Sequence, residues 1–228
     1  WDTEPGRYLD DVPGNISYLQ DSLELLRVLV AQGCKQVITL GSCAEYAASD
    51  GLMQTDDRLD PQTIYAASKA SLSLLGTQIC KGSETLFCWA RLFYIYGPGE
   101  NPKRLVSALL SALLKEQTFP CSKGQKLKDY LYIHDVVAAI ACLLKAGASG
   151  TYNISSGEPV SIAQIAAAAE AASGSSGLVL YGAIPERAWD PDFIAGDNKA
   201  LKALGWQPRY SLDSAMKDYV SALRKNKG

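Results

Sequence analysis

Residues 36–42 read QVITLGS, a short apolar run that ends in a glycine and a serine. A continuous β-branched run of this kind is typical of a strand buried on both faces of a parallel sheet. Before it, residues 15–32 repeat apolar side chains at helical spacing, and Gly33 then ends the predicted helix. This part of the sequence therefore predicts a helix followed by a buried parallel strand.

The same alternation continues along the chain. Residues 65–81 carry apolar side chains at helical spacing, and residues 86–93 (LFCWARLF) form a second apolar run. Helix, strand, helix and strand with short connections predict a parallel sheet covered by helices. Beyond residue 100 the pattern changes, and we expect a helix near 103–116, a strand near 129–133, and helices near 135–146, 161–172 and 211–225.

The composition limits the classes of function. A chain of 228 residues with 47% hydrophobic content is long enough for one domain or for a domain with a smaller lobe. Its 22 basic and 24 acidic residues are interspersed, which argues against binding nucleic acid. No apolar stretch reaches the roughly 18 residues of a membrane span. The absence of a C-x-x-C pair and the single histidine argue against a metal site, and we expect a cytoplasmic protein.

Tyr65 and Lys69 stand four residues apart at the start of a predicted helix, so their side chains leave the same helix face one turn apart. A lysine cation beside a phenol favours the phenolate, so we expect Lys69 to lower the pKa of Tyr65 from its usual value of about 10. Such a pair can exchange a proton with a sugar hydroxyl. About one Y-x-x-x-K is expected by chance here, and an exposed, solvated pair is the competing interpretation.

Ser42 directly follows the predicted buried strand, at the carboxyl edge where open α/β sheets bind ligands. Its hydroxyl can donate to a carbonyl oxygen or accept from a sugar alcohol. A serine that closes a strand end by bonding to the backbone is the competing interpretation. A serine hydrolase using Ser42 with His134 and Asp135 fits less well, because the second glycine of the nucleophile elbow is missing and adjacent side chains point apart.

A series of ordered segments extends this pattern over nearly the whole chain. They are GSCAEY at 41–46 with YAASK at 65–69, RLFYIYGP at 91–98, KDYLYIHD at 128–135, YNI at 152–154 with Gly157, and LGWQP at 204–208. Together they resemble the extended short-chain dehydrogenase/reductase family, in its sugar-nucleotide-modifying, NAD-dependent epimerase/dehydratase branch. The resemblance implies the C-terminal part of a Rossmann-like doubly wound parallel sheet with a smaller α/β substrate-binding lobe.

The same resemblance implies an oxidoreductase or epimerase that uses NAD or NADP and acts on a nucleotide-diphosphate sugar. Tyr65 would be the acid/base, Lys69 would hold the nicotinamide ribose, and Ser42 would orient the reacting sugar oxygen. Leu40 and Phe93 would also contact the cofactor. The substrate contacts implied in this way are Ser42, Cys43, Tyr94, Arg104, Leu105, Lys128, Tyr130, Arg187 and Asp190.

The chain also departs from the family pattern. No G-x-G-x-x-G fingerprint occurs, so we expect the sequence to be the carboxyl-terminal part of a longer enzyme and, alone, to bind dinucleotide weakly or not at all. Cys43 and Ala44 stand where sugar 4,6-dehydratases carry an Asp-Glu pair, which disfavours dehydration. Tyr94 replaces an Asn and Ala47 replaces a Gly. The form of residues 93–100 is similar to reductases and epimerases of 4-keto-6-deoxy sugars, which we favour.

Organisation and assembly follow from the same resemblance. Residues 1–98 are expected to be the remaining part of the Rossmann-like domain. Residues 99–228 would be mainly the substrate-binding lobe, with 129–150 packing back on the sheet. Family members often dimerise through the helices that correspond to 15–32 and 65–81, which implies a homodimer. A non-catalytic binding or assembly relative of the same fold is the alternative function.

Overall fold

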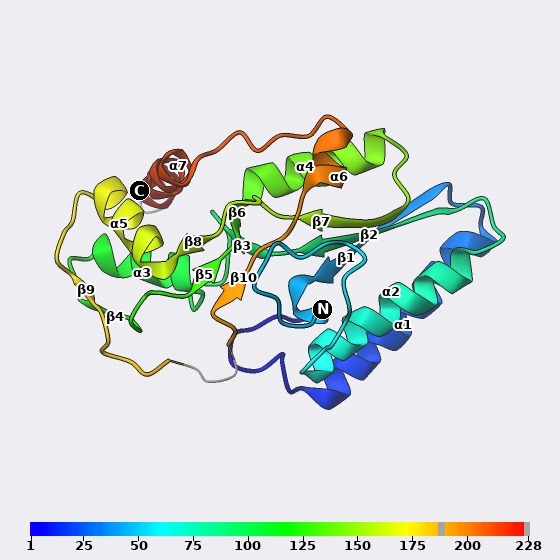
Figure 1. Cartoon of the computed structure of the whole chain (residues 1–228), viewed down its shortest axis with the longest axis horizontal. Helices are drawn as coiled ribbons and strands as arrows, with labels where there is room; N and C mark the ends of the chain where they lie inside the picture. The colour runs from blue at the N-terminus through cyan, green and yellow to red at the C-terminus, as the bar shows by residue number, and fades with distance from the viewer. Residues whose placement is uncertain (187–189, 226–228) are drawn as a thin grey trace.

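The computed structural model describes residues 1–186 and 190–225, and its first layer is a parallel sheet (Figure 1). The three strands run in the order β1-β2-β7, with both pairings parallel, so the predicted fold class is confirmed. Ser42 faces Leu92 in the register of the first pair, which brings the carboxyl ends of these strands together. The strands are β1 (Gln36–Ser42), β2 (Leu86–Leu92) and β7 (Gly150–Ile154).

Helices cover both faces of this sheet, as in a doubly wound α/β fold (Figure 1). The side chains of β2 alternate between the two faces. Phe87 and Trp89 pack into a core with the first pair of helices, whereas Cys88 and Ala90 pack into a core beneath the second pair. The first pair is α1 (Val12–Ala31) and α2 (Ile64–Cys80), and the second is α4 (Ile133–Lys145) and α6 (Lys199–Ala203).

A third apolar core lies among the helices drawn on the left of Figure 1. They are α3 (Leu105–Leu113), α5 (Ile162–Ser173) and α7 (Leu212–Lys225). Short strands connect this group to the first sheet, and most consist of two residues. They are β3 (Tyr94–Tyr96) with β6 (Tyr130–Tyr132), β4 (Phe119–Pro120) with β9 (Val179–Leu180), and β5 (Leu127–Lys128) between β8 (Val160–Ser161) and β10 (Phe193–Ile194).

Two connections position the residues discussed below. β1 leads directly into the 3-10 helix η1 (Cys43–Glu45), and α2 begins after Thr63, whose side chain accepts from the Ala66 amide at 3.2 Å. α2 packs against β1 and η1, and Lys69 in its second turn bonds to Leu40, so the start of α2 lies beside the carboxyl end of β1. In the part of the chain that the structure describes, no helix combines the length and the apolar character that crossing a bilayer requires.

Candidate active site

Tyr65 and Lys69 both lie on the buried face of the first turns of α2. Their exposed fractions are 8% and 7%, although the helix itself is close to the surface. Because α2 packs against β1, this face is directed towards the end of that strand. A solvated surface pair, the competing interpretation of the Y-x-x-x-K spacing, is therefore excluded.

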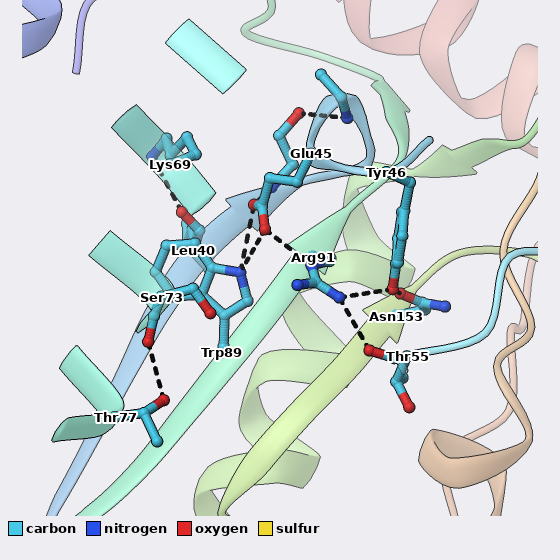
Figure 2. A network of polar contacts seen from close by, with 12 residues as sticks. Leu40, Glu45, Tyr46, Thr55, Lys69, Ser73, Thr77, Trp89, Arg91 and Asn153 are labelled. Atoms are coloured by element: carbon cyan, nitrogen blue, oxygen red, sulfur yellow. Dashed lines mark hydrogen bonds and ion pairs between the residues drawn. The ribbon is translucent and has the colours of Figure 1, made fainter. Parts of the chain in front are cut away.

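The Lys69 ammonium is held against the backbone of β1. Its Nζ donates to the Leu40 carbonyl oxygen at 3.0 Å (Figure 2). The same Nζ lies 4.1 Å from the centroid of the Trp1 ring. Burial disfavours the cation and lowers the pKa of Lys69 to about 8, while the Glu45 carboxylate acts in the opposite direction. An ammonium has three N–H donors, and the bond to Leu40 uses one of them.

The Tyr65 ring is enclosed by aromatic side chains from the start of the chain. Its centroid lies 4.7 Å from that of Tyr8 and 6.2 Å from that of Trp1, both nearly perpendicular to it. Burial raises the pKa of Tyr65 above its usual value, and a hydrogen bond from Ser42 lowers it in part. The prediction that Lys69 lowers this pKa is wrong, because the Lys69 Nζ is directed to the Leu40 carbonyl and lies 5.9 Å from the Tyr65 ring centroid.

The Ser42 side chain interacts with both the backbone of the following helix and the hydroxyl of Tyr65. Ser42 is the last residue of β1 and the N-cap of η1, and its Oγ accepts from the Ala44 amide at 3.2 Å. The same side chain lies close enough to the Tyr65 hydroxyl to lower the pKa of Tyr65. The structure thus brings Ser42, Tyr65 and Lys69 together at the carboxyl end of β1.

A second group of predicted residues gathers around Tyr94 on β3. The Tyr94 and Tyr130 rings lie 5.2 Å apart, and the Lys128 Nζ is 5.7 Å from the Tyr94 centroid. Lys128 is almost fully buried, and its Nζ lies 2.8 Å from Asp190 Oδ1. Two residues expected to surround a diphosphate therefore form an ion pair with each other.

Tyr8 and Cys43 lie between the two groups. The Tyr8 ring packs against Tyr65, and its hydroxyl interacts with Arg104, whose Nη2 also donates to the Thr3 carbonyl oxygen at 3.1 Å. Cys43 is electrostatically coupled to the phenols of both groups. Burial raises the pKa of the Cys43 thiol to about 12, which makes it an inert lining group.

The other predicted site residues that the structure describes do not contact the side chains of Ser42 or Tyr65 in the bonds described above. Leu40 contributes its carbonyl oxygen to Lys69, and Phe93 is buried beside Tyr46. Leu105 is the first residue of α3, and Arg187 lies outside the described residues.

The residues of the hydrolase alternative are engaged elsewhere. The Asp135 carboxylate accepts from the backbone amides of Arg209 and Tyr210. His134 lies beside Asp218, with 3.8 Å between its Nε2 and the Asp218 Oδ2. Ser42 therefore has neither of them as a partner.

Sequence reasoning missed Trp1, Tyr8 and Glu45. Trp1 and Tyr8 precede the first predicted helix. Hydrophobic periodicity does not predict which part of the fold an irregular segment of this kind packs against. Glu45 did leave a signal. Arg91 interrupts an otherwise apolar buried strand, and a buried guanidinium requires an acidic partner.

Comparisons with known proteins agree with this architecture. The model of the NAD dependent epimerase/dehydratase family matches residues 16–155. CDP-abequose synthase of Salmonella typhimurium is 27% identical over 70% of this chain and 56% of its own length. The dTDP-4-dehydro-6-deoxyglucose reductase of Escherichia coli is 23% identical over 95% of this chain and 68% of its own length.

Among solved structures, MoeE5 in complex with UDP-glucuronic acid and NAD has the same fold. It superposes with a TM-score of 0.83 and 24% identity, over 91% of this chain and 71% of its own. The chain thus spans little more than half the length of CDP-abequose synthase and about seven tenths of MoeE5.

Proposed function

The chain belongs to the NAD dependent epimerase/dehydratase family, and we propose that it carries the catalytic group of a nucleotide-sugar reductase or epimerase, formed by Ser42, Tyr65 and Lys69. One observation carries this proposal. A buried phenol, a buried ammonium and a serine hydroxyl converge where β1 ends, at the edge where open α/β sheets bind ligands.

NAD or NADP is the proposed cofactor, and when bound it supplies or accepts the hydride. The donors beside it fit a ribose. The Lys69 ammonium retains donors beyond the one used by Leu40, and the Tyr65 hydroxyl lies one helical turn away. The Leu40 carbonyl fixes the ammonium, so that its direction is set before a ligand arrives. Leu40 and Phe93 are proposed as further cofactor contacts.

The three side chains have complementary roles in reducing a sugar ketone. Tyr65 gives its proton to the carbonyl oxygen as that oxygen gains charge, and Ser42 donates a hydrogen bond to the same oxygen. Lys69, whose Nζ is held at the Leu40 carbonyl, would hold the nicotinamide ribose beside them. Because the pKa of Tyr65 is raised, the resting phenol is protonated, which favours its role as an acid.

The second group of residues suggests the substrate. Lys128 and Arg104 are cations that can satisfy a diphosphate, and the Tyr94 ring, which packs against Tyr130, lies 5.7 Å from the Lys128 Nζ. A diphosphate at Lys128 would replace Asp190 as its partner. Cys43, Leu105 and Arg187 complete the proposed contacts. The likeness to dTDP-4-dehydro-6-deoxyglucose reductase supports a 4-keto-6-deoxy sugar linked to a nucleotide diphosphate.

The proposal also includes the cellular compartment, the division into domains and the oligomeric state. The protein is cytoplasmic, and it divides near residue 98 into a Rossmann-like domain and a substrate-binding lobe. It is a homodimer that pairs through α1 and α2. The last statement is supported by Leu25, Val28, Leu74 and Leu75, which these helices expose.

Hydride transfer by the natural protein tests the proposal. We expect NADH or NADPH to be consumed with at least one 4-keto-6-deoxy sugar linked to CDP, dTDP or GDP, measured by absorbance and by identification of the product. No turnover, and no epimerisation of nucleotide hexoses, would instead support a non-catalytic relative. Hydrolysis of a reporter ester that is lost in Ser42→Ala but kept in Tyr65→Phe would support a hydrolase.

A further inference from the structure

A buried carboxylate, Glu45, lies directly behind Ser42. It is fully buried, and its two oxygens accept hydrogen bonds from three different groups (Figure 2). Oε1 accepts from the Ser42 amide at 2.7 Å, Oε2 accepts from Arg91 Nε at 2.8 Å, and the indole of Trp89 lies 3.1–3.2 Å from both. The carboxylate therefore joins the end of β1 to the side chains of β2.

Arg91 extends this contact across the sheet. Its Nη1 donates to the Tyr46 hydroxyl at 2.9 Å and to the Thr55 carbonyl oxygen at 3.0 Å, and the Tyr46 hydroxyl donates to Asn153 Oδ1 on β7 at 2.7 Å. The network thus fixes the segment after β1 to β2 and to β7. A buried ion pair is roughly neutral in stability compared with apolar residues of similar volume. Stability alone is therefore a weak reason for its presence.

The same carboxylate determines the local conformation of Ser42. The Ser42 Oγ accepts from the Ala44 amide, and the Glu45 side chain accepts from the Ser42 amide, which is a reciprocal capping box. Ser42 is held in an extended conformation by this arrangement, with φ −145° and ψ 143°. This backbone conformation and the bond from the Ala44 amide to Oγ together set the direction of the Ser42 hydroxyl.

We propose that Glu45 is a positioning residue: through the Ser42 amide it sets the orientation of the Ser42 hydroxyl towards Tyr65, and its ion pair with Arg91 anchors that orientation to the sheet. This inference rests on the proposed function. It goes further by assigning a role to a fully buried residue that is not among the proposed cofactor and substrate contacts.

The charge of Glu45 provides a second measurable effect, the pH dependence of kcat. The carboxylate raises the pKa of both Lys69 and Tyr65, which face it from α2. The other titratable and charged groups there are Arg91 on β2, Cys43 on η1, Tyr46 at the end of η1, and Tyr8. Removing the negative charge therefore lowers both pKa values. In the direction of reduction, the alkaline limb of kcat then moves to lower pH.

Two variants separate the hydrogen bond from the charge. Glu45→Gln keeps an oxygen that can accept from the Ser42 amide and removes the charge, whereas Glu45→Ala removes both. Asp135→Asn is the matched control, because Asp135 is also a buried carboxylate that accepts from two backbone amides, at 2.9 and 3.1 Å. It lies on α4, and the amides that it binds belong to Arg209 and Tyr210, which are not among the candidate site residues.

The experiment compares kcat, KM and pH profiles in the natural protein. We expect Glu45→Ala to lower kcat by about tenfold or more with a smaller change in KM, because a misplaced reacting group reduces the rate of the chemical step. Glu45→Gln should lose less kcat and move the alkaline limb down by about half a pH unit or more. Asp135→Asn should lose stability but keep the wild-type kcat and pH profile.

Other outcomes overturn the proposal. They are a wild-type kcat and pH profile in both Glu45 variants, or the same loss of kcat in Asp135→Asn. If the unpaired Arg91 prevents folding, Glu45→Leu combined with Arg91→Met replaces the pair by apolar residues. This double variant should fold and lose kcat, and a wild-type kcat in it also contradicts the proposal. An inactive wild-type protein contradicts the proposed function itself, and with it this inference.

Discussion

Burial moves Tyr65 and Lys69 towards their neutral forms, since it raises the pKa of the phenol and lowers that of the ammonium. The spacing of the two residues was predictable from the sequence, and so was their common helix face. The direction of the Tyr65 pKa shift was not, because it depends on the aromatic residues that cover the ring and on the carbonyl that holds the Lys69 Nζ. Neither contact is local in sequence.

The buried cation of Lys69 predicts a pH-dependent stability. Its folded pKa of about 8 lies below the ordinary value of 10.5, so between these pH values the unfolded state binds more protons than the folded one. Wild-type protein should therefore gain stability relative to Lys69→Met as pH rises through this window, by on the order of 2 kcal/mol. Urea unfolding of both proteins from pH 7 to 10 measures the difference. A constant difference would show that the cation is not desolvated.

At the scale of the elements, the site depends on how closely β1 approaches β2. Gly41 precedes Ser42, and a Cβ at this position would lie 2.4 Å from the Trp89 indole nitrogen and 2.6 Å from Glu45 Oε1. The sequence predicted that a strand ends here, but the need for glycine is visible only with its neighbours in place. The two-residue strands, such as β5 and β10, were missed for the same reason, because only tertiary pairing defines them.

Gly41→Ala should therefore disturb both the strand and the site. We expect a loss of about 1–3 kcal/mol in unfolding free energy, because the added methyl group displaces Trp89 and Glu45. Gly51→Ala is the control, since a Cβ there meets nothing within 4 Å, and it should stay within about 0.5 kcal/mol of the wild type. Chemical denaturation gives both values, and equal losses would show that the close packing at Gly41 is unimportant.

At the scale of the whole molecule, the sequence predicted the six longer helices and the strands β1 and β2 well, whereas the five-residue helix α6 and the strand β7 were not predicted. The helix expected at residues 15–32 is α1, which begins earlier, at Val12, because Asp11 accepts from the Gly14 amide. The sequence did not predict the pairing of β7 with β2 or the close approach of Tyr94, Lys128 and Asp190. These residues are far apart in the chain, and only the folded topology brings them together.

The proposed dimer is a prediction at the same scale. Leu74 on α2 is 62% exposed, and burying it against a second copy would remove apolar surface from water. We expect the natural protein to sediment as a dimer and Leu74→Glu to sediment as a monomer. Leu144→Glu, at a position on α4 that is 60% exposed, should leave the dimer intact. A monomeric wild type, or dissociation by both substitutions, contradicts an interface through α1 and α2.

The central claim is that the Tyr65 hydroxyl transfers the proton during hydride transfer. The most direct measurement is single-turnover hydride transfer in the natural protein, comparing wild type with Tyr65→Phe. The variant keeps the ring that packs between Tyr8 and Trp1, so folding and ligand affinity should change little. The account predicts a rate lower by about 10²–10⁴-fold. A Tyr65→Phe rate within about threefold of the wild type would contradict it.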